Sequence, residues 1–154
     1  MATDFSTERI VKETMDWVVD TILIPHFQSL GLNASGEWLE NLNTRVEAQK
    51  GIINGRKYSE QLVWGRRPGK RPPISALEKW VQVKLGLSGA EAKGAAFAIA
   101  KKIEREGTEI YKKGGTDLLE VLNKPETIKK INEKLAGLMK VEVELYLKRE
   151  IQSV

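Results

Sequence analysis

The chain has 154 residues, of which 41% are hydrophobic, so it is long enough to bury the core of one domain. It contains no cysteine, which excludes disulfides, thiolate catalysis and cysteine-based zinc sites. Its 25 Lys and Arg residues against 21 Asp and Glu residues give a net charge of +4. Neither the N-terminus, Met1–Ser6, nor the longest uncharged run, Thr21–Gly36, has the pattern of a signal peptide or a membrane span, so we expect a soluble protein with no membrane partner.

The N-terminal segment, residues 7–31, predicts an amphipathic helix. Its apolar side chains recur with the period of a helix, at positions 11, 15, 18, 22, 23 and 27. We expect Thr7 to be its N-cap and Gly31 to lie just beyond its end. Because Pro25 lies inside this segment, the helix should be kinked or interrupted near Thr21–Leu23.

Residues 37–64 change to a strand-like pattern. Residues 45–50 and 56–64 alternate, imperfectly, between polar and apolar side chains. Asn54-Gly55 lies between them and is typical of a tight hairpin turn. We therefore expect a β-hairpin that turns at Asn54-Gly55 and whose second strand ends at Trp64.

The next segment is short, stiff and strongly basic. Pro72 and Pro73 fix φ and cannot donate backbone hydrogen bonds, so no helix or central strand can run through them. Residues 56–71 hold six basic residues and one acidic residue, a net charge of +5, so the rest of the chain nets −1. Such local basicity favours a contact with phosphate or carboxylate groups, although a charged loop can also be merely solvated. The candidate contact residues are Trp64, Arg66, Arg67, Pro68, Gly69, Lys70, Arg71, Pro72 and Pro73.

The C-terminal half predicts helices. Two capping boxes, each a serine with a glutamate three residues later, open helices at Ser75 and Ser88, which we expect to end near Leu85 and Glu106. The second helix has an alanine-rich inner face that lets a neighbouring element approach closely, so we expect it to be the central core helix. The residues of this face are Ala92, Ala95, Ala96, Ile99, Ala100 and Ile103.

The C-terminal residues, 116–154, are less uniform. A short helical turn is expected at residues 116–122, and Pro125 should open a last helix with Ile128, Ile131, Leu135 and Leu138 on one face. The alternating apolar side chains of residues 139–147 fit a strand, yet their spacing also fits a helix. The abundance of Lys, Glu and Leu favours the helix.

No arrangement in the sequence indicates an active site. His26 is the single histidine, so a helix cap or a packed side chain is a better interpretation than a metal ligand. Gly65–Lys70 differs from a phosphate-binding loop, because three residues instead of four separate its glycines and Arg71 replaces the magnesium-binding Ser or Thr. We expect no catalytic residue, metal or cofactor, and interpret the protein as not an enzyme.

The four tryptophans have different expected places. Trp17 and Trp80 fall on apolar helix faces and are expected in the core, whereas Trp38 lies near a loop. Trp64 adjoins the arginines, where it can stack on an arginine or anchor the loop in the core.

Two motifs together resemble those of a known family. The first is Gly-Arg-Arg-Pro-Gly-Lys-Arg-Pro-Pro at residues 65–73, followed by Ala76-Leu77 and Trp80-Val81; the second is Ala98-Ile-Ala-Lys-Lys-Ile103 with Glu106-Gly107-Thr108. Over roughly residues 8–115 the chain resembles the neck or tail-completion proteins, also called head–tail connectors, of tailed double-stranded-DNA bacteriophages. Its pattern is closest to the versions in crAss-like phages, whereas residues 116–154 resemble no family.

The resemblance implies an α+β fold with a long N-terminal helix, a β-hairpin or small antiparallel sheet, and a helical C-terminal half. It implies one domain, residues 1–154, with a core at about 8–115 and a helical extension at 116–154. It also implies a virion protein, assembled in the host cytoplasm into a six- or twelvefold homo-oligomeric ring at the head–tail junction. The partners would be the portal or other neck proteins, tail proteins, and genomic DNA passing through the lumen without sequence-specific binding.

The alternative is a free-standing nucleic-acid-binding domain that uses the Arg66–Arg71 loop on phosphates. Against it, the net charge is small and no predicted helix carries a basic stripe. One aromatic residue adjoins the patch in sequence, which is too few for a base-stacking platform.

Overall fold

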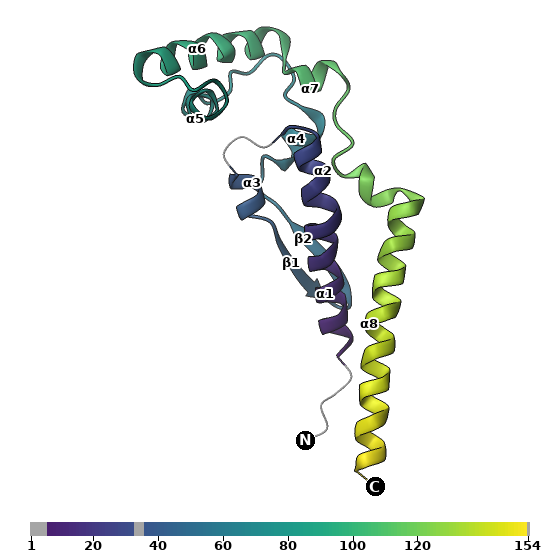
Figure 1. Cartoon of the computed structure of the whole chain (residues 1–154). Helices are drawn as coiled ribbons and strands as arrows, with labels where there is room; N and C mark the ends of the chain where they lie inside the picture. Colours follow the sequence, from purple (N-terminus) through teal and green to yellow (C-terminus); the bar gives the residue numbers. More distant parts are fainter. Residues whose placement is uncertain (1–5, 33–35, 154) are drawn as a thin grey trace. The chain divides into compact units, whose positions relative to one another are not determined.

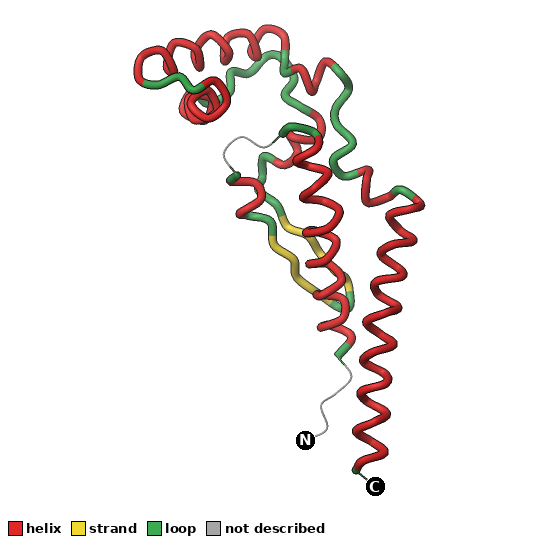
Figure 2. Tube along the Cα trace, viewed as in Figure 1, coloured by secondary structure: helices red, strands yellow, loops and turns green. Residues whose placement is uncertain are grey.

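The computed structural model of the chain describes residues 6–32 and 36–153 and has an α+β fold, as expected. A long N-terminal helical segment leads into one antiparallel hairpin and then a helical C-terminal half (Figure 2). The elements are the helices α1 (Thr7–Val18), α2 (Ile24–Ser29), α3 (Glu37–Glu40), α4 (Ser59–Trp64), α5 (Ile74–Leu85), α6 (Gly89–Glu106), α7 (Glu109–Lys112) and α8 (Pro125–Gln152), the π-helix η1 (Val19–Leu23), the 3₁₀ helix η2 (Glu120–Asn123), and the strands β1 (Asn43–Glu47) and β2 (Lys50–Asn54).

The chain divides into two compact units. One comprises Met1–His26, Leu42–Asn54 and Leu119–Val154, and the other comprises Phe27–Asn41 and Gly55–Leu118. The expectation of one domain with its core at residues 8–115 stays a prediction. Met1–Ser6, where we expected no signal peptide, lies outside the described residues except for Ser6. Within residues 6–32 and 36–153, every helix is too short or too polar to cross a bilayer.

The interruption of the N-terminal helix is confirmed. The π-helix η1 separates α1 from α2 and ends two residues before Pro25, which has no N–H to continue the α-helical ladder. The expected N-cap is off by one residue, because the hydroxyl of Ser6, not Thr7, accepts the backbone N–H of Arg9 at 3.2 Å. Gly31 follows α2 in the left-handed region, with φ +66°.

In the first unit, α1 packs on both strands of the hairpin and on α8 (Figure 1). Its inner face buries Ile10 and Val18, and η1 buries Val19 and Leu23. Polar contacts tie the layers together: Asp16 of α1 accepts a hydrogen bond from Thr44 of β1 and pairs with Lys12 at 2.7 Å.

The hairpin does not turn where the sequence predicted. The residues of the turn are Ala48 and Gln49, both with positive φ, and β1 pairs with β2 so that Val46 lies opposite Gly51. Gly51 lies against Met15 of α1, because a Cβ on Gly51 would be 2.3 Å from the Met15 Cγ. Packing against α1 therefore fixes the register and outweighs the local turn preference of Asn54-Gly55. Residues 56–64, expected as the second strand, contain no strand: residues 57–58 form a turn, and residues 59–64 form α4 instead.

The last helix, α8, begins at Pro125 and continues through residues 139–147, so the helical interpretation of that segment is confirmed. Arg9 of α1 forms an ion pair with Glu142, whose side chain is 9% exposed. Thr127 and Glu142 are the buried residues among those described in α8, and Ile128, expected on the inner face, is exposed. Many apolar side chains of its C-terminal half are also exposed: Met139, Val141, Val143, Leu145, Tyr146, Leu147 and Ile151.

In the second unit, α5 crosses α6 at a steep angle and packs against its alanine-rich face (Figure 1). Val81 of α5 is fully buried with Ala92 and Ala96 of α6, since the small alanine side chains let the two helices approach closely. Ala100 is fully buried as well. The expected inner face of α6 is thus confirmed.

The capping box predicted at Ser75 is wrong. For the one predicted at Ser88, the position of the N-cap is confirmed but the capping hydrogen bond is not formed. α5 begins at Ile74 with Pro73 as its N-cap, because Ile74 itself packs against the Val81 core, and Ser75 lies inside the helix. Ser88 is the N-cap residue of α6, but its side chain makes no capping hydrogen bond. The helix ends at Gly86 and Gly107 are confirmed.

The structure gives Trp38 and Trp80 different environments. Trp38, in the short helix α3, is buried, stacks on Phe27 with ring centroids 4.3 Å apart, and donates its indole N–H to the Ser59 hydroxyl at 2.8 Å. Trp80, expected in the core, is 39% exposed, because the buried face of α5 carries Leu77 and Val81.

Candidate functional site

The candidate site is the basic loop, which we define as Gly65–Pro73, between α4 and α5. Three backbone hydrogen bonds hold it against the end of α6 and the start of α7. The Arg66 N–H donates to the Thr108 hydroxyl and the Thr108 N–H donates to the Arg66 carbonyl, both at 2.9 Å. The Gly69 N–H donates to the Glu104 carbonyl at 2.8 Å. The loop backbone is therefore fixed, although most of its side chains are exposed.

Two glycines make this close contact possible. Gly65 has φ +72°, and a Cβ on it would lie 2.3 Å from the Tyr111 backbone nitrogen. Gly107 has φ +78°, and a Cβ on it would lie 2.8 Å from the Arg66 carbonyl oxygen. Because L side chains rarely adopt these backbone conformations and both sites are sterically closed, each position requires glycine.

The end of α4, which carries Trp64, is held by the segment after α7. The Thr116 N–H donates to the Val63 carbonyl at 2.6 Å, and the Thr116 hydroxyl donates to the Leu62 carbonyl at 2.9 Å. Trp64 ends a helix and not the expected strand, and its side chain is 60% exposed. It is therefore not a core anchor for the loop.

The four cations of the loop do not share one role. Arg71 is turned towards α6, where its guanidinium pairs with Glu104 at 2.7 Å and lies over the Phe97 ring at 5.5 Å. Lys101 lies over the same ring at 5.2 Å. The charge of Arg71 is thus compensated within the protein, which the count of loop charges could not reveal.

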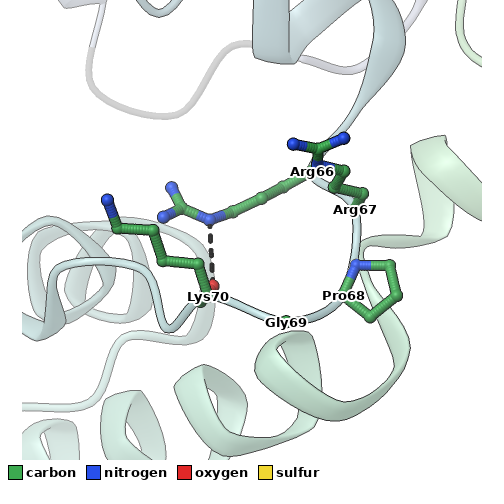
Figure 3. A pocket seen from close by; sticks show the side chains of 5 residues that line it. All are labelled: Arg66, Arg67, Pro68, Gly69 and Lys70. Atoms are coloured by element: carbon green, nitrogen blue, oxygen red, sulfur yellow. Dashed lines mark hydrogen bonds between the residues drawn. The ribbon is translucent and has the colours of Figure 1, made fainter.

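The other three cations have no carboxylate partner among the residues that the structure describes. The Arg66 guanidinium reaches across the loop and donates to the Lys70 carbonyl at 3.4 Å (Figure 3). It also donates to the Arg71 carbonyl at 3.4 Å. The exposed side chains of Arg67 and Lys70 make neither an ion pair nor a hydrogen bond with residues 6–32 or 36–153. Arg66, Arg67, Pro68, Gly69 and Lys70 together line a hollow of about 600 Å³.

The remaining candidates have structural places. Pro72 is buried, and Pro73 is the N-cap of α5, so neither lines the hollow. The structure thus brings residues 66–70 together and separates Trp64, Arg71, Pro72 and Pro73 from the lining.

Four residues that support the loop were not predicted as site residues: Phe97, Glu104, Thr108 and Tyr111. Gly107-Thr108 is conspicuous in the sequence as part of the second motif, but its pairing with residue 66 across about forty residues is a tertiary contact without a local signal. Phe97 lies beneath the Arg71 guanidinium, and Tyr111 lies against Gly65 and Gly107. They are 42% and 44% exposed, so two further exposed aromatic side chains lie close to the loop.

Next to the loop, the carboxylates are engaged by other cations. Arg105 and Lys112 donate hydrogen bonds to Glu106 and lower the pKa of its carboxyl to about 2. Lys112 also pairs with Glu109 at 3.0 Å, which lowers the pKa of that carboxyl and raises the pKa of Lys112. With Glu104 bound to Arg71, none of these acids neutralises Arg66, Arg67 or Lys70.

Comparison with protein-family models, with curated proteins and with solved structures finds no match to this chain. In the described part of the chain, no group of three or more His, Cys, Asp or Glu side chains is arranged to hold a metal ion.

Proposed function

We propose that this chain is a non-catalytic structural subunit of the head–tail junction of a tailed bacteriophage. It would assemble into a six- or twelvefold ring that joins the portal vertex to the tail and surrounds the DNA exit channel. A heterologous contact between identical subunits produces such a ring when its rotation closes.

One observation carries the proposal: the two sequence motifs that resemble the connector family form a single hydrogen-bonded unit. Residues 65–73 supply the basic loop, and Gly107-Thr108 supplies its anchor through two reciprocal hydrogen bonds at 2.9 Å. The glycines at 65 and 107 are those that the close contact requires. The resemblance therefore concerns a physical module and not scattered positions.

The character of this module also supports a contact role. An element that must meet a neighbour repeatedly in one geometry benefits from a rigid backbone, because less conformational freedom is lost on binding. The basic loop combines such a backbone with exposed cations. The neighbours would be the portal or other neck proteins, tail proteins and the passing genome.

The test is a charge-removal variant in the virus that encodes the chain. Changing Arg66, Arg67, Lys70 and Arg71 together to Gln should leave the fold intact and stall assembly at filled heads without tails. A matched control removes four exposed lysines of α8, at positions 129, 130, 140 and 148, by the same change to Gln. Electron microscopy of the particles reads out both. Normal yields of infectious particles from the loop variant, or absence of the chain from wild-type virions, would refute the proposal.

A second candidate is a free-standing nucleic-acid-binding domain, and one observation favours it. Trp64, Phe97 and Tyr111 are all exposed close to the basic loop, so the shortage of aromatic side chains seen in the sequence is partly removed. A nanomolar, sequence-dependent complex of the purified chain with DNA, together with its absence from virions, would select this candidate.

A further inference from the structure

We propose that the hollow of the basic loop is a binding site for the phosphates of duplex DNA, formed by Arg66, Arg67 and Lys70 and not by Arg71. The inference rests on the proposed function for the identity of the DNA, which would be the packaged genome. Its physical basis is that Arg71 is paired with a carboxylate, whereas the three cations that line the hollow are not.

The first step is the uncompensated charge. Arg71 is neutralised by Glu104, whereas Arg66, Arg67 and Lys70 line one hollow without a carboxylate partner in residues 6–32 and 36–153. Three cations held close together repel one another, and a bound polyanion would relieve that repulsion.

The second step is preorganisation. Arg66 is held across the loop by two backbone carbonyls, and the loop backbone is fixed by three hydrogen bonds to residues 104 and 108. At Gly69, with φ +107°, no atom lies within 4 Å of where a Cβ would be, so a ligand can approach the backbone closely. Binding would therefore have to order the side chains of Arg67 and Lys70, but neither the loop backbone nor the Arg66 side chain.

The third step selects the ligand. The lining consists of three cations, one glycine and one proline. Pro68 is its one apolar side chain, and it lacks the Tyr, Trp, Phe and Met side chains that are enriched in protein–protein contacts. All lining residues except Arg66 are exposed, so the hollow is open and suits an extended polymer better than an enclosed small anion. These properties favour the DNA backbone over an acidic protein surface.

The binding should be weak, independent of sequence and sensitive to salt. Neutralising three phosphates predicts a log–log slope of affinity against salt concentration of about −2.7, from about −0.9 per phosphate. Between 50 and 200 mM salt, the affinity would then fall about fortyfold. Such a contact holds DNA without stopping it from sliding.

The experiment is a salt titration of the full chain with a 20-base-pair duplex, followed by fluorescence anisotropy. Arg67→Gln/Lys70→Gln should reduce the slope to about −0.9, so that the same salt change lowers the affinity only three- to fourfold. Glu104→Gln should release Arg71 and steepen the slope by about 0.9. The control, Lys140→Gln/Lys148→Gln, removes the same two charges from α8 and should keep the wild-type slope. Circular dichroism checks that each variant is folded.

Three outcomes would overturn the inference. The first is that the chain does not bind the duplex at about 20 mM salt, and the second is that the salt dependence of the affinity decreases equally in the loop and control variants. The third is that the chain binds polyglutamate in preference to DNA, which would assign the hollow to an acidic protein. Because the assay uses the purified chain, its result is independent of whether the chain is found at the head–tail junction.

Discussion

The anchor of the basic loop can be tested by one substitution, Gly107→Ala. Gly107 follows α6 with φ +78° and ψ 179°, a region of backbone conformation occupied almost only by glycine. Holding alanine there costs about 1–3 kcal/mol. The new methyl group would also lie 2.8 Å from the Arg66 carbonyl oxygen and 2.9 Å from the Tyr111 Cδ1. The oxygen belongs to the backbone, so the loop itself has to shift.

That shift would break the hydrogen bond from the Thr108 N–H to the Arg66 carbonyl, which contributes about 0.5–1.5 kcal/mol. Adding the two terms, we expect Gly107→Ala to lower the free energy of unfolding by about 1.5–4.5 kcal/mol. With a urea m-value of about 2 kcal/mol per molar, the midpoint should fall by about 1–2 M.

Gly94→Ala is the matched control, inside α6, the helix that Gly107 follows. Gly94 lies in the interior of α6, has a helical backbone, and has no atom within 4 Å of where its Cβ would be. Alanine there should stabilise the chain by about 0.5–1 kcal/mol, because it loses less conformational freedom on folding. The assay is urea unfolding of the full chain, followed by tryptophan fluorescence. If both substitutions move the midpoint in the same direction, or if Gly107→Ala shifts it by under about 0.3 M, the anchor is not under steric constraint.

Three further predictions follow from contacts in the two units. Thr108→Val removes the hydroxyl that accepts two backbone N–H groups and should cost about 1–2 kcal/mol, whereas Thr108→Ser should retain most of the stability in the same urea assay. Hydrogen bonding from Lys12 lowers the pKa of Asp16 below 3.8, so the ionised Asp16 stabilises the fold fully above about pH 4 and loses this effect as the pH falls through its folded-state pKa. The free energy of unfolding should therefore fall more between pH 6 and pH 3 in wild type than in Asp16→Asn. The difference should be under about 1 kcal/mol, since the Lys12–Asp16 pair is half-exposed. Gly51→Ala should destabilise the hairpin by about 1–3 kcal/mol through its clash with Met15, and combining it with Met15→Ala should cost less than the two single changes added together.

Each of these has a clear contrary result. Equal stability of the Val and Ser variants at position 108 would mean that the hydroxyl does not hold the loop. A pH dependence that is unchanged in Asp16→Asn would assign it to other carboxyls. Strictly additive effects at positions 15 and 51 would contradict their direct contact.

The sequence by itself determined where the long helices lie and end, whereas α3 and α7 were not predicted and α4 was expected as a strand. Gly86, Gly107 and Pro125 mark boundaries that the structure confirms, because glycine and proline restrict the backbone whatever surrounds them. The same holds for the interruption before Pro25. The buried alanine face of α6 could also be predicted, since small side chains at helical spacing are typical of a face against which another element packs closely.

For residues 139–147 the apolar periodicity fits both a strand and a helix. Backbone hydrogen bonding explains why the segment is helical. A helix satisfies its N–H and C=O groups within the segment, whereas a strand needs a partner strand. No described strand pairs with this segment.

Only the tertiary structure decided the hairpin and the site. Asn54-Gly55 has the stronger local turn preference, yet the contact of Gly51 with Met15 moves the turn to Ala48-Gln49. In the same way, four adjacent cations look equivalent in sequence, and a carboxylate 33 positions away removes Arg71 from the set. Turn preferences and single charges contribute about a kilocalorie per mole each, so contacts between distant residues readily outweigh them. Backbone restrictions of several kilocalories per mole are not outweighed in this way, and for that reason they could be read from the sequence alone.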